Sequence, residues 1–441
     1  MLNKIEELYG RQINASRIAK ELLENKQVDY RKAIKTDHQQ IVCQRCGTKL
    51  NQQEARLPNS NYYCPVCLNL GRVSTLNPLV TIPEPNDFPS NASPLTWRGR
   101  LTAEQARCSK EIIEGFNHHQ SRLLWAVTGA GKTEMLFPGI EWALRRKMRV
   151  GIASPRVDVC LELYPRIKAA FQHTSLVLLH GKSKQKYRYT QLVICTVHQL
   201  LRFYRAFDVL IIDEVDAFPL VHNPPLQYAI RHAVKIDGRR LFLTATPTRR
   251  LLRLVHRHQL AVSRLPIRFH RHLLPVIKCH LVPGWRNKLK KKLPKLLIRI
   301  ISHHLRHQLR FLLFVPKISD LSRVSLILKR YFNPHDWRTV YSQDPQRLSK
   351  VKLMREKQVK FLITTTILER GVTFPGIDVI ILGADNDVFS TSSLVQIAGR
   401  VGRKKDRPYG NVDFFIHSYT RSVIAAQRQI HHLNYWGAKL L

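Results

Sequence analysis

A loop of small residues is the first part of the sequence that could do chemistry. After the apolar run RLLWAV, residues 126–133 read AVTGAGKT, with Ala126 where the strict phosphate-loop pattern has Gly, and the helical EMLFPGIEWALRR follows. Small residues let backbone N–H groups wrap a phosphate at a helix N-terminus. Lys132 is expected to contact the β and γ phosphates of ATP, and Thr133 to coordinate Mg²⁺. The rest of the cradle is Thr128, Gly129, Ala130 and Gly131.

Carboxylates follow a second apolar run, FDVLIIDEVD, where its strand should end. A carboxylate at a strand tip that faces a phosphate loop can hold Mg²⁺ through water, and Asp213 suits that role. Glu214 is then positioned to orient or deprotonate the attacking water. The competing interpretation is an acidic turn without a catalytic role, which the upstream phosphate loop disfavours.

Four of the eight cysteines form a metal-ligand pattern, Cys43-x2-Cys46 and Cys64-x2-Cys67. Two such turns complete a tetrahedral zinc site of four sulfurs. Gly47 follows the second ligand, where a tight turn needs a residue without a Cβ. The alternatives are accidental spacing or a redox dithiol, but a redox pair needs no second copy. Because a closed site has no open coordination position, it should fold a small module whose loss leaves the phosphate-loop chemistry largely intact.

Apolar runs alternate with helical stretches from Trp97 onward, and these elements would position the loop and the carboxylates. A first series is RLLWAV, RVGIASP, LVLLH, QLVICT, FDVLIIDE and RLFLTAT. After a break near Arg264–Pro275, a second series is RFLLFVP, TVYSQ, KFLITTT, DVIILGA and VDFFIHS. Nearly continuous apolar strands separated by helices indicate parallel sheets covered on both faces. The predicted fold class is α/β, with two tandem doubly wound parallel-sheet domains preceded by the small four-cysteine zinc module.

The charge balance indicates a polyanionic partner. Among 441 residues, Lys and Arg number 72 and Asp and Glu number 31, which gives a formal net charge of +41. This excess favours nucleic acid, with an anionic membrane surface as the competing partner. No apolar run approaches the roughly 20 residues of a membrane span, and the charged N-terminus does not resemble a secretory signal. An intracellular, reducing location without disulfides is expected.

Basic and aromatic residues also surround the cysteine pairs. They could form a nucleic-acid face or a solvated surface, and the sequence favours neither interpretation. These residues are Lys49, Arg56, Tyr62, Tyr63 and Arg72.

Over roughly residues 97 to 420 the motifs resemble those of superfamily 2 helicases, which commonly use the A-x-x-G-x-G-K-T phosphate loop. The resemblance implies RecA-like domains, ATP and Mg²⁺ as cofactors, and Gln105 of LTAEQ as the amide that pairs the adenine edge. Thr244–Thr246 resembles the element that couples hydrolysis to strand binding. The residues that match loops touching the DNA strand are Ser154, Pro155, Arg156, Thr196, Thr365, Thr366 and Arg370.

The segment QIAGRVGR resembles the sixth motif of this superfamily. Gln396, Arg400 and Arg403 recur at spacings of four and three, which would place them along one side of a helix. The two guanidiniums would act as arginine fingers on the γ-phosphate when ATP draws the two domains together. Opening and closing of that cleft would move the two strand-binding domains relative to each other. The alternative is a solvated basic helix end.

Further segments narrow the resemblance. The N-terminal YGRQ, the cysteine module ahead of the motor, SPRVDVCLELYPR, DEVDAFP and LERGVTFPGIDV together resemble the ComFA family of late competence proteins. This resemblance covers nearly the whole chain. It implies a cytoplasmic ATPase stimulated by single-stranded DNA, peripheral at the inner face of the cell membrane with other competence proteins. Such a protein would drive or receive transforming DNA, and its oligomeric state stays open.

Two other functions remain open. A duplex-unwinding helicase of the PriA type, in replication restart or repair, carries its zinc-binding insertion inside the second motor domain, whereas no cysteine pair follows Cys279 here. A passive zinc-dependent DNA-binding adaptor would need a vestigial motor, although every expected catalytic side chain is present. The expected domains are an N-terminal region with the zinc module at 1–76, a linker at 77–96, an ATP-binding RecA-like domain at 97–263 and a second RecA-like domain at 264–441.

Overall fold

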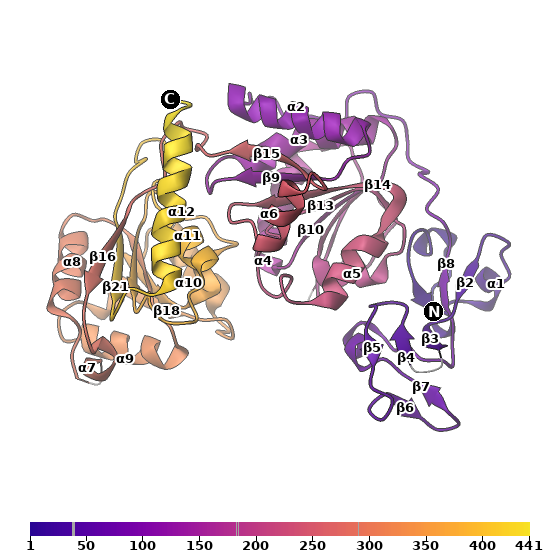
Figure 1. The fold of residues 1–441 in the computed structure, drawn as a ribbon, viewed down its shortest axis with the longest axis horizontal. Coiled ribbons are helices and arrows are strands. Elements are labelled where there is room, and N and C mark those ends of the chain that lie inside the picture. The colour runs from indigo at the N-terminus through magenta and orange to yellow at the C-terminus, as the bar shows by residue number, and fades with distance from the viewer. Residues whose placement is uncertain (38–39, 182, 184, 290) are drawn as a thin grey trace. The chain divides into compact units, whose positions relative to one another are not determined.

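The computed structural model describes residues 1–37, 40–181, 183, 185–289 and 291–441. The chain divides into two compact units, the first made of Met1–Trp125 and Lys132–Arg264, the second of Ala126–Gly131 and Leu265–Leu441. Each unit is built on its own parallel sheet (Figure 1). The predicted pair of parallel-sheet domains is confirmed.

The sheet of the first unit has the strand order β11-β12-β10-β13-β14-β9-β15. Neighbouring strands from β11 to β9 run parallel. Each apolar run of the first predicted series falls on one of these parallel strands, because a strand buried on both faces has no polar side to alternate with. The strands are β9 (Arg122–Ala126), β10 (Val150–Ser154), β11 (Leu176–Leu179), β12 (Leu192–Thr196), β13 (Phe207–Ile212), β14 (Val234–Thr244) and β15 (Ala261–Leu265).

Helices precede the first strand and connect most of the others. Thr102 caps the first of them through a capping box, in which its Oγ1 accepts from Gln105 N–H at 3.3 Å and the Gln105 amide oxygen accepts from Thr102 N–H at 2.9 Å. This helix, α2, packs on α3 (Figure 1). The helices of the first unit's motor part are α2 (Ala103–Asn117), α3 (Lys132–Arg145), α4 (Val157–Ala170), η4 (Val197–Arg202), α5 (Pro224–Ala233) and α6 (Arg249–His256).

The second unit has the parallel strand order β16-β21-β20-β17-β19-β18. Its strands are β16 (Ile277–Leu281), β17 (Phe311–Phe314), β18 (Trp337–Val340), β19 (Phe361–Thr364), β20 (Asp378–Leu382) and β21 (Val412–Ile416). Its helices are α7 (Trp285–Lys288), α8 (Lys295–Arg306), α9 (Ile318–Leu328), η5 (Pro334–Asp336), α10 (Arg347–Arg355), η6 (Thr366–Glu369), α11 (Thr391–Ala398) and α12 (Arg421–Ala438). The strand predicted at TVYSQ lies slightly earlier, because buried Trp337 pairs with Phe361 and extends β18 toward its start.

The N-terminal region consists of short elements. Its helical turns are η1 (Ile5–Glu7), η2 (Ala15–Arg17), α1 (Lys20–Leu23) and η3 (Pro65–Leu70). Its strands are β1 (Ile13–Asn14), β2 (Asp29–Arg31), β3 (Ile34–Asp37), β4 (Gln40–Cys43), β5 (Lys49–Leu50), β6 (Arg56–Leu57), β7 (Asn61–Tyr62) and β8 (Leu79–Thr81). They form the antiparallel sheets β1-β8-β2, β3-β4-β5 and β6-β7.

Part of the linker expected at 77–96 is built into the fold. Its residues Leu79–Thr81 form β8, which pairs with β1 and β2, and Leu79 and Val80 are fully buried. A little further on, buried Glu84 forms an ion pair with Lys235 of β14 at 2.6 Å. An extended linker was expected from Pro, Asn and Ser content, and the apolar LVT run and the buried carboxylate fix its first part in place.

The zinc module also packs into the motor. Its cysteines belong to one continuous hydrophobic core with residues of β12, η4 and α5. Gln12 Nε2 donates to the backbone oxygen of Leu201 at 2.9 Å, and the Tyr228 hydroxyl of α5 donates to Gln44 O at 3.2 Å. The module is therefore part of the first compact unit. Within the described chain, no helix has the length and apolar character needed to cross a membrane.

Candidate functional site

The phosphate loop connects β9 to α3. Gly129 and Gly131 have φ values of +80° and +75°, in the left-handed region that favours glycine. Ala130 N–H donates to Val127 O at 3.2 Å, which closes the turn. Lys132 is the first residue of α3. The predicted cradle therefore lies just ahead of a helix N-terminus, where backbone N–H groups bind phosphate.

The loop residues Ala126–Gly131 are grouped with the second unit. Phe269 N–H donates to Gly129 O at 3.1 Å, and Thr128 Oγ1 donates to Gly399 O at 3.1 Å. Gly399 belongs to the predicted sixth motif. Within the second unit, that motif therefore holds the hydroxyl that was expected in the phosphate cradle.

The predicted magnesium and catalytic carboxylates follow β13 directly. Asp213 N–H donates to Ala153 O of the neighbouring strand β10 at 2.8 Å, and Asp213 Oδ1 accepts from Glu214 N–H at 2.8 Å. These bonds fix the Asp213 carboxylate at the carboxyl edge of the sheet. Glu214 has a φ of +53°, an uncommon conformation for a residue with a side chain and one that concentrates at functional sites. Both residues directly follow the strand tip at which the sequence predicts a magnesium site.

Asp216 connects the acidic loop to the next predicted motif, a role that the sequence reasoning missed. Thr244 Oγ1 donates to its Oδ1 at 2.6 Å, and Thr246 Oγ1 donates to its Oδ2 at 2.5 Å. Thr246 N–H in turn donates to Thr244 Oγ1 at 2.9 Å. The only sequence signal for this role is the position of Asp216 at the end of DEVD. A change at the acidic loop can therefore reach the 244–246 segment through one buried carboxylate.

The predicted adenine-reading amide is held by the start of α2. Gln105 is buried, and its amide oxygen accepts from Thr102 N–H, so the side chain has a fixed orientation. The capping box that starts the helix thus also positions this amide.

Two loops of the first unit that were predicted to bind the DNA strand lie side by side. Ser154 ends β10 and Thr196 ends β12, and the parallel register pairs them directly. Both side chains are buried, and Ser154 Oγ accepts from Arg156 N–H at 3.4 Å. Ser154 and Thr196 therefore shape the loops from inside, whereas Pro155 is buried and Arg156 is partly exposed at the N-cap of α4.

In the second unit, Thr365 and Thr366 lie partly exposed at the start of η6. Arg370, at the other end of η6, is 4% exposed, and its Nη2 donates to Ser392 Oγ at 2.8 Å. Its guanidinium lies inside the fold and holds the start of α11. Three residues here were predicted to contact the DNA strand. The two threonines have accessible side chains, whereas that of Arg370 is buried.

The sixth motif departs from the prediction. Gln396 lies in α11, but α11 ends at Ala398, so Arg400 and Arg403 do not continue one helical side. The reason is that Gly399 and Gly402 interrupt the segment, and glycine disfavours helix. Arg400 is buried and donates to Val372 O, and Arg403 Nε donates to Gly399 O at 3.1 Å. Both guanidiniums are positioned by a turn.

Arg268 also contacts this turn, although it belongs to none of the predicted motifs. Its side chain is 1% exposed and donates to Gly402 O at 2.8 Å and to Gly399 O at 3.3 Å. Burial, and then the charge of Arg403, lower the pKa of Arg268 to about 9. A buried cation thus organises the two carbonyls that flank Arg400.

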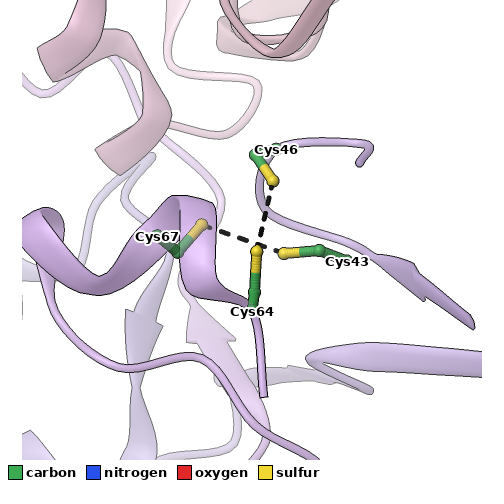
Figure 2. A group of neighbouring side chains, drawn as sticks. All are labelled: Cys43, Cys46, Cys64 and Cys67. Atoms are coloured by element: carbon green, nitrogen blue, oxygen red, sulfur yellow. Dashed lines mark hydrogen bonds between the residues drawn. The ribbon is translucent and has the colours of Figure 1, made fainter. Parts of the chain in front are cut away.

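The four cysteines meet at one point, two from the β4 turn and two from around η3 (Figure 2). Their sulfurs all lie within 4.8 Å of one another, with Cys43 Sγ 3.9 Å from Cys67 Sγ and Cys46 Sγ 3.6 Å from Cys64 Sγ. A tetrahedron with Zn–S distances of about 2.3 Å has S···S edges of about 3.8 Å. The four side chains are buried. This donor set fits one tetrahedral zinc ion.

Residues next to the cysteines fix their positions. Gly47 has a φ of +71°, and its N–H donates to Cys43 O at 2.8 Å, as the predicted knuckle turn requires. A Cβ at Gly47 would lie 2.3 Å from the Tyr228 ring, so the motor packs directly on the turn. Arg45 Nε donates to Cys67 Sγ at 3.3 Å. Such a bond orients a ligand and stabilises its thiolate charge.

Family models match three stretches of the chain. Residues 5–81 match the competence protein ComFA N-terminal domain. Residues 102–254 match the DEAD/DEAH box helicase domain, and residues 291–405 match the helicase conserved C-terminal domain. The matches follow the N-terminal region and the two parallel sheets in order.

Relatives and solved structures resemble the chain over most of its length. The competence protein ComFA of Bacillus subtilis is 40% identical over 425 residues, which cover 95% of this chain and 91% of the relative. ComFA of Streptococcus pneumoniae is 40% identical over 403 residues, covering 91% and 92%. The Saccharomyces cerevisiae Dbp5 structure bound to RNA and ADP BeF3 has a TM-score of 0.54 at 14% identity, covering 76% of this chain and 91% of that one. Mycobacterium smegmatis helicase Lhr, bound to ssDNA and AMP-PNP, has a TM-score of 0.56 at 16% identity, covering 77% and 50%. The last two likenesses concern the fold alone.

Proposed function

Because the chain belongs to the ComFA family of competence proteins, we propose that it is a motor stimulated by single-stranded DNA that drives or receives transforming DNA. The helicase domains make it an ATP-hydrolysing, helicase-type enzyme. The observation that carries the finer proposal is the bonding of Asp216 to Thr244 and Thr246, which joins the hydrolysis loop to the segment that follows β14.

The proposed hydrolysis roles are assigned by position in the fold. Lys132, at the first turn of α3, neutralises the β and γ phosphates of ATP. Glu214 orients the attacking water or accepts its proton. Thr133 and Asp213 hold Mg²⁺, which supplies charge stabilisation at the phosphates when bound. Gln396, Arg400 and Arg403 contact the γ-phosphate side, and Gln105 contacts adenine.

Strand binding is assigned to the loops at the carboxyl edges of the two sheets. The contacts come from Arg156 and the backbone around Thr196 in the first unit, and from Thr365 and Thr366 in the second. Lys and Arg exceed Asp and Glu by 72 to 31, which supports binding to phosphates without sequence preference. The buried side chains of Ser154 and Arg370 support these loops from within.

Zinc is proposed as a structural ion held by Cys43, Cys46, Cys64 and Cys67. With four protein ligands it has no open position for chemistry, so its role is to hold the N-terminal region on the first unit. Family membership supports action in the cytoplasm at the inner face of the membrane with other competence proteins. The positive charge is suited to that anionic surface as well as to DNA.

Displacement of streptavidin from biotinylated single-stranded DNA tests the motor proposal directly. The purified chain with ATP should displace streptavidin from one end of the strand, and the Lys132→Ala variant should not. Hydrolysis without displacement from either end would contradict translocation.

A further inference from the structure

A pocket of about 450 Å³ lies where the N-terminal segment, the zinc module and the motor part of the first unit meet. Five arginines line it: Arg11, Arg17, Arg45, Arg72 and Arg202. Among the described residues that line the pocket, none is Asp or Glu. The neutral polar residues Gln12, Asn14 and Ser16 complete its polar wall. The catalytic and strand-binding residues assigned above do not contribute to it.

The arginines of this pocket lie close enough to repel one another, and the one carboxylate that acts on Arg11, that of Glu7, lies outside the lining. Arg11 is only 8% exposed, and its Nε and that of Arg202 have no hydrogen-bond partner among the described residues. Burial lowers the pKa of Arg11 to about 10. Burial, and then the charges of Arg45 and Arg17, also lower the pKa of Arg202. Such crowding costs stability unless an anion occupies the pocket, because like charges repel most strongly where solvent is scarce.

The pocket is braced by the zinc module. The Arg45 guanidinium donates to Cys67 Sγ at 3.3 Å and to the backbone oxygens of Cys67 at 2.9 Å and Gly71 at 2.6 Å. Arg202 ends η4, the helix that begins immediately after Thr196. Arg45 is therefore fixed by the cysteine cluster, and Arg202 is carried by an element of the motor that leads from a loop proposed to bind the DNA strand.

Size and composition of the lining identify the ligand class. All the cations are arginines, whose planar guanidiniums pair with two phosphate oxygens at once. A volume of about 450 Å³ exceeds what one phosphate ion fills. No Phe, Tyr or Trp occurs among the described lining residues, so the pocket has no platform on which a base would stack. A phosphodiester backbone, bound without base recognition, fits these features better than a free nucleotide.

We propose that this arginine pocket binds backbone phosphates of the single-stranded DNA on which the motor acts, outside the strand-binding loops of the two sheets. The inference rests on the proposed function for the identity of the strand. It adds a second DNA contact, one that couples the zinc module to the motor. Because the contact is with phosphates, it is independent of sequence and strongly dependent on salt.

The test is the salt dependence of DNA binding by the full chain loaded with zinc. Anisotropy of a labelled oligothymidylate is measured between about 50 and 200 mM salt for the parent and for Arg17→Gln/Arg202→Gln. Each lost single-strand phosphate contact lowers the slope of log K against log salt by about 0.7, so the variant should lose about 1.4. The matched control is Lys26→Gln/Lys35→Gln, which removes two exposed charges of the N-terminal region outside the pocket and should keep the parent slope.

Zinc content and melting temperature equal to those of the parent show that the double variant is folded. If it is not, Arg72→Gln on the exposed rim replaces it, with an expected slope loss of about 0.7. If the folded pocket variant keeps the parent slope of log K against log salt, the proposal is wrong. It is also wrong if the control variant loses as much slope as the pocket variant. Calorimetry with inorganic tripolyphosphate distinguishes DNA phosphates from a free polyphosphate as the ligand. If the variant loses tripolyphosphate binding but keeps the salt slope of DNA binding, the pocket binds a free polyphosphate and the proposal is wrong.

The pocket and the motor are tested separately. If Lys132→Ala hydrolyses ATP at the parent rate, the proposed motor function is wrong. The salt slope of DNA binding still tests the pocket in that case. If Arg17→Gln/Arg202→Gln leaves the salt slope of DNA binding unchanged, the pocket does not bind DNA. The proposal of ATP hydrolysis is unaffected by that result.

Discussion

The carboxylate of Asp216 accepts a hydrogen bond from Thr246 Oγ1 at 2.5 Å, between residues 30 positions apart in the sequence. Thr244 Oγ1 donates to the other oxygen of the same carboxylate. The acidic loop therefore has two roles. Asp213 and Glu214 are proposed to act on ATP, and Asp216 ties that loop to the end of β14 and the segment that follows it.

Thr246→Val removes one of these donors while keeping the side-chain shape. It should lower the free energy of unfolding by about 1–3 kcal/mol, because a buried carboxylate loses a hydrogen bond. It should also reduce the ratio of DNA-stimulated to unstimulated ATP hydrolysis. The control is Thr248→Val, which removes the N-cap of α6 at a similar cost of about 1 kcal/mol. If both variants lose stimulation equally, the loss reflects stability and the coupling role of Asp216 is wrong.

Arg268→Lys should lower kcat for ATP by about tenfold with a smaller effect on KM, the size of change expected when about 1.4 kcal/mol of transition-state positioning is lost. Lysine keeps the charge but cannot hold both Gly399 and Gly402 carbonyls with the fixed geometry of guanidinium. Steady-state kinetics at saturating DNA measures the effect. A parent kcat in the lysine variant would show that charge alone suffices.

Cys64→Ser should destabilise the whole first unit and not only the N-terminal region. The cysteine cluster shares a continuous core with η4 and α5, so loss of the ion loosens motor contacts as well. Calorimetry should show a lower melting temperature for the first unit, with zinc content near zero. Cys279→Ser, outside the cluster, should keep both zinc and melting temperature. An unchanged melting temperature for the motor part of the first unit would show that the zinc module folds independently of it.

Gly47→Ala tests the packing of the zinc turn on the motor. A left-handed conformation costs an L-residue roughly 1–2 kcal/mol, and the new Cβ would also press on Tyr228. Urea unfolding should show a larger loss than that figure, and Gly47→Ala should cost less when it is made in the Tyr228→Ala background. Gly181→Ala is the control, because a Cβ there meets nothing within 4 Å. Equal losses at the two glycines would contradict close packing of Tyr228 on the turn.

The sequence predicted the parallel sheets well because their strands are continuous apolar runs. Strands β9 to β13 each fall within a predicted run, and so do β17, β19, β20 and β21. The phosphate loop and the acidic strand tip were predicted for the same reason, since local residue types at fixed spacing determine both. The edge strands β15 and β16 have mixed, polar sequences and gave no comparable pattern.

What the sequence did not indicate depends on contacts between distant segments. Gln12 bonds to Leu201 across 189 positions, and Glu84 pairs with Lys235, yet neither pair leaves a local pattern. The end of α11 at Ala398 was missed because a spacing of four and three fits a helix, while the intervening glycines break it. Arg268 was missed because an isolated arginine in a basic chain carries no signal of burial.

The most direct measurement is steady-state ATP hydrolysis with no nucleic acid, single-stranded DNA, duplex DNA and single-stranded RNA, with Lys132→Ala as the blank. We predict strong stimulation by single-stranded DNA and little by the others. Equal or greater stimulation by RNA or duplex DNA would contradict the single-stranded DNA motor, and hydrolysis no higher than that of Lys132→Ala under all four conditions would contradict the enzyme itself.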